Sequence, residues 1–243
     1  MRRIPAAFQA IMATITDNLQ AVKDRIARAA AAAQRDSSSV ALVAVSKTHP
    51  PSLVREAHAA GQKAFGENYV QEALEKMDAL GLPLEWHLIG PLQSNKTRPV
   101  AERFDWVHTL EREKIARRLS EQRPAGLGEL NVLIQLNVSG ERSKSGVSAG
   151  EIPALARSIA TLANLRLRGL MAVPEATPDV GLQRARFRQV REIFERLRGA
   201  GFELDTLSMG MSDDMESAIA EGATLVRIGT AIFGARASVR GAA

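Results

Sequence analysis

The 243-residue sequence contains no cysteine. Disulfides, cysteine-ligated zinc sites and cysteine nucleophiles are therefore excluded, and the lack of disulfides suits a reducing cytoplasm. No apolar run approaches the roughly 20 residues that a membrane span requires. Met1-Arg2-Arg3 leads into a helical pattern rather than into the apolar core of a signal peptide. We therefore expect a cytoplasmic protein that does not associate with membranes.

Aromatic residues are also scarce, at 4% of the chain. The net charge is +5 and the sequence pI is near 10, which raises the question of a nucleic-acid ligand. However, basic residues alternate with acidic ones, as in residues 111–114 and 184–198. Stacking platforms for single-stranded nucleic acid need more aromatic side chains than this chain has. We interpret the charges as solvated helix faces and expect no nucleic-acid partner.

No linker or low-complexity tract divides the chain, and 45% hydrophobic residues can form a sizeable core. The alanine-rich residues 27–33 are better explained as a helix end than as a linker. We therefore predict one domain over residues 1–243, with its core at about residues 8–236.

The pattern of apolar residues predicts eight strands separated by helical segments. The strands are expected at residues 40–48, 63–66, 85–89, 104–108, 130–138, 165–173, 203–208 and 224–228. A long amphipathic helix with Ile11, Ile15, Leu19, Val22 and Ile26 on one face precedes them. Further helices are expected at residues 51–60, with Ser52 as a possible N-cap, and at 67–77, 94–101, 111–122, 149–163, 182–199 and 213–220.

Eight strands alternating with helices are typical of a parallel (β/α)8 barrel, that is, an α/β fold of the TIM-barrel type with an extra N-terminal helix. A doubly wound open sheet is the second possibility. The barrel prediction carries a consequence for function, because chemistry in this fold gathers at the C-terminal ends of the strands.

Lys47 ends the apolar run that forms the first predicted strand. A lysine in this position can simply extend into solvent. The last strand, however, is followed by Gly229 and Thr230, where a short extra helix would begin. Backbone N–H groups at such a helix start carry partial positive charge and can bind a phosphate. Ser208 and Ser212, after the seventh strand, add two hydroxyl donors.

In a closed barrel the eighth strand pairs with the first, so one ligand can reach both Lys47 and the phosphate site. A lysine amine in a desolvated barrel mouth can attack an aldehyde and form a Schiff base. An aldehyde that carries a phosphate is therefore the implied ligand, and pyridoxal 5'-phosphate (PLP) is the obvious candidate.

The chain resembles the YggS/PROSC family of pyridoxal phosphate homeostasis proteins from about residue 8 to Arg236. The resemblance lies in five long segments: Val45-Ser-Lys-Thr48, Phe65-Gly-Glu-Asn-Tyr69, Trp86-His-Leu-Ile-Gly-Pro-Leu-Gln-Ser-Asn-Lys96, Leu207-Ser-Met-Gly-Met-Ser-Asp-Asp-Met215 and Val226-Arg-Ile-Gly-Thr-Ala-Ile-Phe-Gly234. It implies the fold of the N-terminal barrel of alanine racemase without the second domain of the racemase.

The resemblance also implies a role for each matching residue. Lys47 would be the Schiff-base lysine, and Arg227 would face the pyridine nitrogen. The phosphate would be bound by the backbone of Gly229 and Thr230 and by Ser208 or Ser212, with Met209 in the same binding segment. Asn68 would lie near the ring or its 3-hydroxyl, and His87 is a weaker candidate for lining the site. We predict no metal site and no catalytic residue.

The sequence favours a carrier over an enzyme, because racemisation needs a second proton carrier opposite the lysine. The only tyrosine is Tyr69, and Pro51 stands where alanine racemase has a tyrosine four residues beyond its lysine. We therefore predict a non-catalytic, monomeric protein that buffers PLP or delivers it to apo PLP-dependent enzymes. The alternatives are a racemase that uses a residue such as His87, and a barrel enzyme that uses Lys47 on phosphorylated sugar aldehydes or ketones. The loop at residues 140–146 receives no assigned role.

Overall fold

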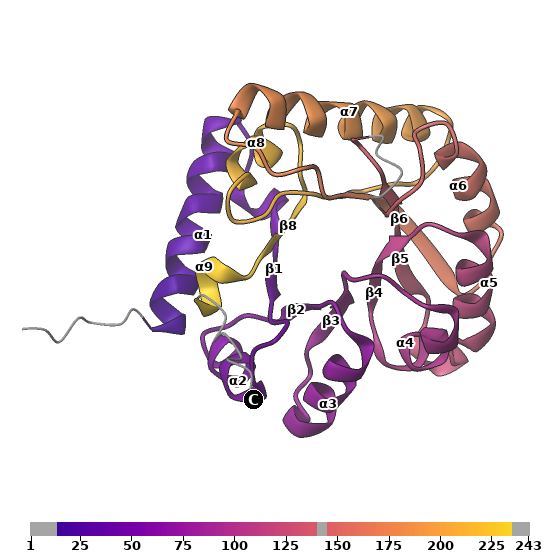
Figure 1. Ribbon diagram of the computed structural model, residues 1–243, viewed down its shortest axis with the longest axis horizontal. Coiled ribbons are helices and arrows are strands. Elements are labelled where there is room, and N and C mark those ends of the chain that lie inside the picture. The colour runs from indigo at the N-terminus through magenta and orange to yellow at the C-terminus, as the bar shows by residue number, and fades with distance from the viewer. Residues whose placement is uncertain (1–13, 140–144, 235–243) are drawn as a thin grey trace, which may run out of the picture.

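The computed structural model describes residues 14–139 and 145–234. Its strands form one closed parallel barrel, because each strand pairs with the next along the chain and β8 pairs with β1 (Figure 1). The strands are β1 (Ala41–Val45), β2 (Ala64–Glu67), β3 (Glu85–Leu88), β4 (Trp106–Leu110), β5 (Leu130–Leu136), β6 (Leu165–Ala172), β7 (Thr206–Ser208) and β8 (Leu225–Ile228). The predicted (β/α)8 barrel is confirmed, and the open sheet is excluded by the pairing of β8 with β1.

Helices surround the barrel as a ring (Figure 1). They are α1 (Ile15–Ala32), α2 (Pro51–Ala59), α3 (Val70–Leu80), α4 (Thr97–Arg103), α5 (Glu113–Gln122), α6 (Ile152–Ala160), α7 (Val180–Gly199), α8 (Met215–Ala220) and the short α9 (Thr230–Phe233). Single 3-10 turns occur at Ser37–Ser39, Ser94–Lys96 and Ala125–Leu127.

The extra N-terminal helix packs against α8 and α9 and so covers the seam between β8 and β1 (Figure 1). Its first turn is closed by a capping box, in which Thr14 and Asp17 satisfy each other's backbone N–H groups. The predicted apolar face is buried at Ile15, Leu19, Val22 and Ile26, and Ile11 lies outside the described residues. This packing holds the last βα unit, and with it the end of β8, in place.

Two details of the first βα units differ from the sequence prediction. Pro50, not Ser52, is the N-cap of α2, because Pro51 takes the first helical position, where a missing N–H is harmless. The helix predicted from residue 67 begins only at Val70, because Glu67 still belongs to β2. The residues between them therefore form a loop at the C-terminal end of the barrel.

The barrel interior contains apolar and polar side chains. Trp106, Leu133 and Met171 form an apolar cluster. The polar side chains are His87, His108, Ser208 and Arg227, all 4% exposed or less. Interiors of such barrels are normally filled by branched apolar side chains, so these buried polar residues point to function.

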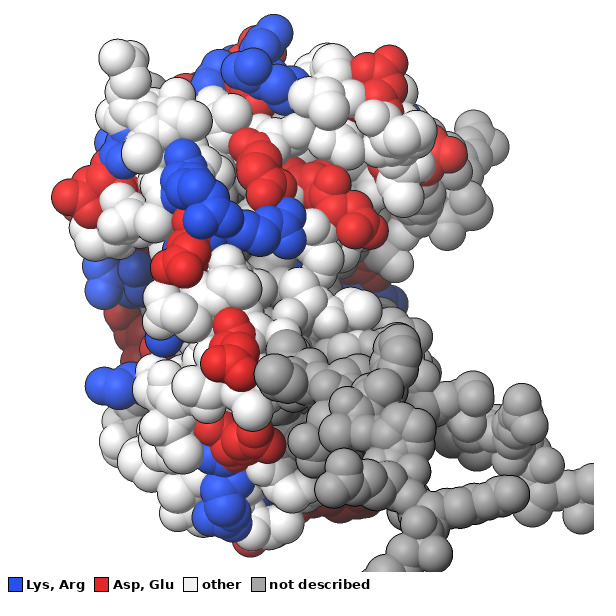
Figure 2. Space-filling view, turned by 90° about the vertical axis from the view of Figure 1, so that its left-hand side faces the viewer, with Lys and Arg blue, Asp and Glu red and all other residues white. Residues whose placement is uncertain are grey.

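The outer surface carries interspersed charges, as Figure 2 shows for the side formed by α1 and its neighbours. Arg25 on α1 pairs there with Glu216 on α8. Neither sign forms a continuous field on this face, consistent with solvated helix faces. Within residues 14–139 and 145–234, no helix combines the length and the apolar character needed to cross a bilayer.

Candidate functional site

Lys47 lies in a tight turn two residues beyond β1 and is half-buried. The buried Lys76 of α3 fixes the chain before it, since its Nζ lies 2.7 Å from the carbonyl oxygen of Ser46. Glu72 fixes the chain after it by accepting the Thr48 N–H at 2.5 Å. Thr48 itself adopts φ 64°, a left-handed conformation that is rare for a β-branched residue. The turn that presents Lys47 is therefore held on both sides.

A buried ion cluster beneath this turn supplies the holding groups. Lys76 Nζ lies 2.7 Å from Glu67 Oε1 and 2.7 Å from Glu72 Oε1, and Ser46 Oγ donates to Glu67 Oε1 at 2.6 Å. Burial raises the pKa of Glu67, and the charge of Lys76 opposes that rise. Among the described residues, Glu67 Oε2 is buried without a hydrogen-bond partner. Burying these charges costs desolvation free energy, and removal of one member would strongly destabilise the fold.

Arg227 reaches into the barrel from β8, level with Val43 on β1. Its Nη1 donates to Ser208 Oγ at 2.5 Å and its Nη2 donates to the Ala172 carbonyl oxygen at 3.0 Å. Burial lowers the pKa of Arg227 to about 10, and the nearby Asp214 opposes this shift. The guanidinium therefore remains charged at neutral pH and is held in one orientation at the base of the mouth.

His108 of β4 meets Ser208 of β7 across the barrel, because these strands are not neighbours in the sheet. The His108 Nδ1 to Ser208 Oγ distance is 2.9 Å, and His108 Nε2 lies 2.9 Å from His87 Nδ1. His87 Nε2 lies 2.6 Å from Glu85 Oε1. Burial lowers the pKa of His108 well below its usual value, and the neighbouring His87 and Arg227 add to this shift.

The loop after β7 is fixed by short polar contacts. Gly210, at φ 96°, allows the turn, and an added Cβ there would lie 2.7 Å from Ala218 Cβ. Asp214 accepts the Met211 N–H at 2.6 Å, and Arg25 of α1 donates to the Ser212 carbonyl oxygen at 3.1 Å. Ser212 is half-buried and Met209 is fully buried. Ser212 is thus placed at the mouth on a rigid loop.

The end of β8 lies against the end of β1. A Cβ on Gly229 would lie 3.1 Å from the Val45 carbonyl oxygen, so the glycine permits this close approach. Thr230 begins α9, whose first N–H groups have no carbonyl partner within the helix. Lys47 and the Gly229–Thr230 turn therefore project from adjacent strands, as the closed barrel requires.

Asn68 follows β2 at the mouth and is half-buried. Its backbone packs directly on Gly90, the residue two beyond β3, where any Cβ would overlap the Asn68 carbonyl oxygen. Thr109 of β4 donates to the Gly90 carbonyl oxygen at 2.7 Å. The ends of β2, β3 and β4 are thus tied together around the mouth.

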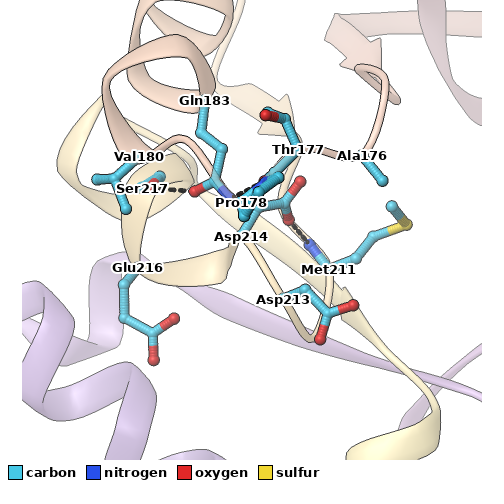
Figure 3. A pocket seen from close by; sticks show the side chains of 10 residues that line it. All are labelled: Ala176, Thr177, Pro178, Val180, Gln183, Met211, Asp213, Asp214, Glu216 and Ser217. Atoms are coloured by element: carbon cyan, nitrogen blue, oxygen red, sulfur yellow. Dashed lines mark hydrogen bonds between the residues drawn. The ribbon is translucent and has the colours of Figure 1, made fainter.

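A cavity of about 600 Å³ lies beside the mouth, where the loops after β6 and β7 meet (Figure 3). Gln183 and Ser217 are hydrogen-bonded in its wall at 2.6 Å, and Met211 borders it. Its lining also includes Asp213, Asp214 and Glu216. These carboxylates do not favour a phosphate in this cavity.

The structure thus brings Lys47, Ser212, Arg227, Gly229 and Thr230 to the ends of the three consecutive strands β7, β8 and β1. Asn68 lies one strand farther along. Ser208 and His87 lie deeper, inside the barrel, and are bonded to other side chains. Sequence reasoning did not single out Lys76, Glu67 or His108. For Glu67 and His108 the available signal was a polar residue in a largely apolar strand, whereas Lys76 lies on α3 and carried no such signal.

Comparisons with known proteins identify the family of this chain. The family described as alanine racemase, N-terminal domain, matches residues 18–237. The pyridoxal phosphate homeostasis protein of Pseudomonas aeruginosa is 62% identical over 226 residues, which are 93% of this chain and 97% of that protein.

Two solved structures of PipY from Synechococcus elongatus are also similar. The structure without PLP is 36% identical with a TM-score of 0.82, and the one with PLP bound is 35% identical with a TM-score of 0.80. Each match covers 91% of this chain and 100% of PipY. The chain therefore belongs to the pyridoxal phosphate homeostasis protein family, built on the alanine racemase N-terminal barrel.

Proposed function

We propose that this protein binds pyridoxal 5'-phosphate as a Schiff base on Lys47 and acts in PLP homeostasis without turning over a substrate. The observation that carries the proposal is the clamped turn, which presents Lys47 beside the Gly229–Thr230 turn on the adjacent strand. Bound PLP would supply an aldehyde that condenses reversibly with an amine and releases water. The names of the relatives and the PLP-bound PipY structure support the same ligand.

The residues at the mouth fit this ligand. Thr230 and Gly229 offer backbone N–H groups and Ser212 offers a hydroxyl, so together they can hold a phosphate. Ser208 suits this role less well than Ser212, because its hydroxyl oxygen already contacts both Arg227 and His108. Of the two serines predicted from the sequence, we therefore assign the phosphate to Ser212.

Arg227 would face the pyridine nitrogen at the base of the mouth. A guanidinium donates hydrogen bonds and accepts none, so it leaves the ring nitrogen without a proton. A ring in this state withdraws electrons less strongly than one paired with a carboxylate. The charge held by Arg227 therefore favours storage of the cofactor over carbanion chemistry.

The racemase alternative needs a second proton carrier above the cofactor. Tyr69 is 60% exposed at the N-cap of α3, in the loop after β2. His87 is 1% exposed in the barrel interior, with both ring nitrogens engaged. His87 is therefore not available as a second base, which supports the carrier. We also propose that the protein is a monomer that passes PLP to apo PLP-dependent enzymes.

The test is an absorption spectrum of the protein mixed with PLP, followed by borohydride reduction and peptide mapping. We expect the reduced adduct on Lys47, its loss in Lys47→Ala, and no effect of Lys63→Ala, which removes an exposed lysine at the opposite barrel end. An adduct on another lysine would refute the assignment. Efficient turnover of any L- or D-amino acid that depends on Lys47 would refute the carrier and support the racemase. Absence of a PLP adduct would favour a barrel enzyme acting on other aldehydes.

A further inference from the structure

A continuous chain of hydrogen bonds crosses the barrel interior from β3 to β8. Its links are Glu85 Oε1 to His87 Nε2 at 2.6 Å, His87 Nδ1 to His108 Nε2 at 2.9 Å, His108 Nδ1 to Ser208 Oγ at 2.9 Å, and Ser208 Oγ to Arg227 Nη1 at 2.5 Å. The Glu85 side chain is 49% exposed at the N-terminal end of its strand. The chain therefore connects solvent at one end of the barrel with Arg227 near the other.

Packing alone does not explain this chain. Apolar side chains would fill the same interior without losing hydration, whereas a buried imidazole must have its nitrogens bonded to offset its desolvation. Here both ring nitrogens of both histidines have a partner. His87 also stacks on the Trp106 ring at a centroid distance of 5.4 Å, which fixes its plane. The hydrogen bonds and the ring stacking therefore fix the orientation of the two imidazole rings, which apolar filling of the same space would not require.

The two ends of the chain fix the direction of every hydrogen bond in it. Arg227 can only donate, so Ser208 Oγ accepts at that end, while the Glu85 carboxylate accepts from His87 Nε2. With neutral imidazoles, His87 Nδ1 must accept from His108 Nε2. His108 Nδ1 must then accept the hydroxyl proton of Ser208. All the bonds run in one direction, and Ser208 is left with no proton to donate elsewhere.

One proton added to His87 reverses the two middle bonds. His87 Nδ1 then donates to His108 Nε2, and His108 Nδ1 donates to Ser208 Oγ, which releases the serine hydroxyl proton beside Arg227. Burial holds the pKa of His108 low, which favours transfer through this residue over storage on it. The other charged groups around the chain are Asp105 near His87, Arg168 over the Trp106 ring, and Asp214 near Arg227.

We propose that His108 and His87 are positioning residues that orient Arg227 through Ser208, and that they transmit protonation at the Glu85 end to the ring of bound PLP. This inference rests on the proposed function, because it assumes that Arg227 faces the cofactor ring. The consequence is a cofactor whose electronic state responds to pH through groups it never touches.

Two substitutions at His108 test its hydrogen bonds to Ser208 and to His87 separately. The amide of His108→Asn stands near the position of Nδ1 and keeps the contact with Ser208, whereas that of His108→Gln stands near Nε2 and keeps the contact with His87. We expect the Kd for PLP to rise about three- to tenfold in the Gln variant and to stay within about twofold in the Asn variant. His58→Gln, outside the barrel on α2, is the matched control and should match the parent protein.

The pH readout is the absorbance of bound PLP between pH 5.5 and 9. The parent protein should show a transition that Glu85→Gln displaces, because this variant removes the carboxylate at the end of the hydrogen-bond chain. Both His108 variants should lose this pH-dependent absorbance transition. Equal Kd values in the two His108 variants, or a transition unmoved by Glu85→Gln, would overturn the inference. Because Glu85 is half exposed, this variant tests the relay even if a His108 variant does not fold. Failure of the parent protein to form the Lys47 adduct would instead refute the proposed function.

Discussion

Replacing Lys76 with methionine is the most direct test of the ion cluster beneath Lys47. The side chain is 4% exposed and its Nζ makes three contacts of 2.7 Å, to Ser46, Glu67 and Glu72. Methionine fills the space but leaves the buried Glu67 carboxylate without its cation. Breaking one partner of such a pair lowers the free energy of unfolding by about 3 to 5 kcal/mol, which for a chain of this size lowers Tm by roughly 6 to 20 °C.

The loss should depend on pH, because Lys76→Met removes the influence that opposes the raised pKa of Glu67. A carboxyl group whose folded pKa is above its unfolded pKa gives stability that is present below the unfolded value and is lost as pH rises through the folded value. The deficit of the variant relative to the parent protein should therefore be smallest below about pH 4.5 and should grow toward neutral pH.

Urea denaturation of a double-mutant cycle measures this coupling. Glu67→Gln combined with Lys76→Met removes the unpaired charge, so the double variant should be more stable than Lys76→Met alone by about 2 kcal/mol. Lys63→Met, at an exposed position, is the control and should change stability by less than about 0.5 kcal/mol. A cost below about 1 kcal/mol for Lys76→Met, or simple additivity in the cycle, would show that the cluster is hydrated and does not hold the turn.

Three further predictions concern the mouth and the outer surface. Gly90→Ala should lower the free energy of unfolding by about 3 kcal/mol and weaken PLP binding, because the added Cβ would displace the Asn68 backbone. An unchanged free energy of unfolding and an unchanged Kd would show that the loop at Asn68 can shift without cost. Ser212→Ala should weaken the binding of PLP but not of pyridoxal, which has no phosphate, whereas Ser208→Ala should weaken both alike; titration of each variant with the two ligands decides between these serines. Glu221→Gln removes the carboxylate that pairs with three arginines of α7 and should lower the free energy of unfolding by about 1 to 2 kcal/mol. The loss should be smaller in 1 M NaCl, and a loss that is independent of salt would contradict an electrostatic origin.

Under the proposed function, the polar interior would explain how a racemase-type barrel can store a cofactor. Lys47 and the Gly229–Thr230 turn use only the ends of adjacent strands. The remaining interior positions are then available for groups that set the charge near the ring, and here they hold Arg227, Ser208 and the two histidines. On this proposal, different residues would attach the cofactor and control its electronic state.

The sequence alone determined the fold and predicted the attachment point of the ligand. Eight apolar runs separated by amphipathic segments specify strands and helices through local periodicity, and parallel pairing then places every strand end, including Lys47 and Gly229, at one face. The family resemblance of the motifs around Arg227, Ser208 and Ser212 predicted roles for these residues. The strand boundaries were less well predicted, as at Glu67, because the ends of strands depend on which backbone groups find a partner.

The tertiary structure decided what local pattern could not encode. His87 and His108 are 21 residues apart, and His108 and Ser208 are 100 residues apart, so only barrel closure brings them to 2.9 Å. The same holds for Lys76. The sequence places it on a helix, where a charged side chain normally faces solvent, but in the folded barrel its Nζ lies 2.7 Å from the Ser46 carbonyl oxygen. Periodicity states which side of an element is buried, whereas hydrogen bonds between elements depend on register and shear, which emerge only when the barrel closes.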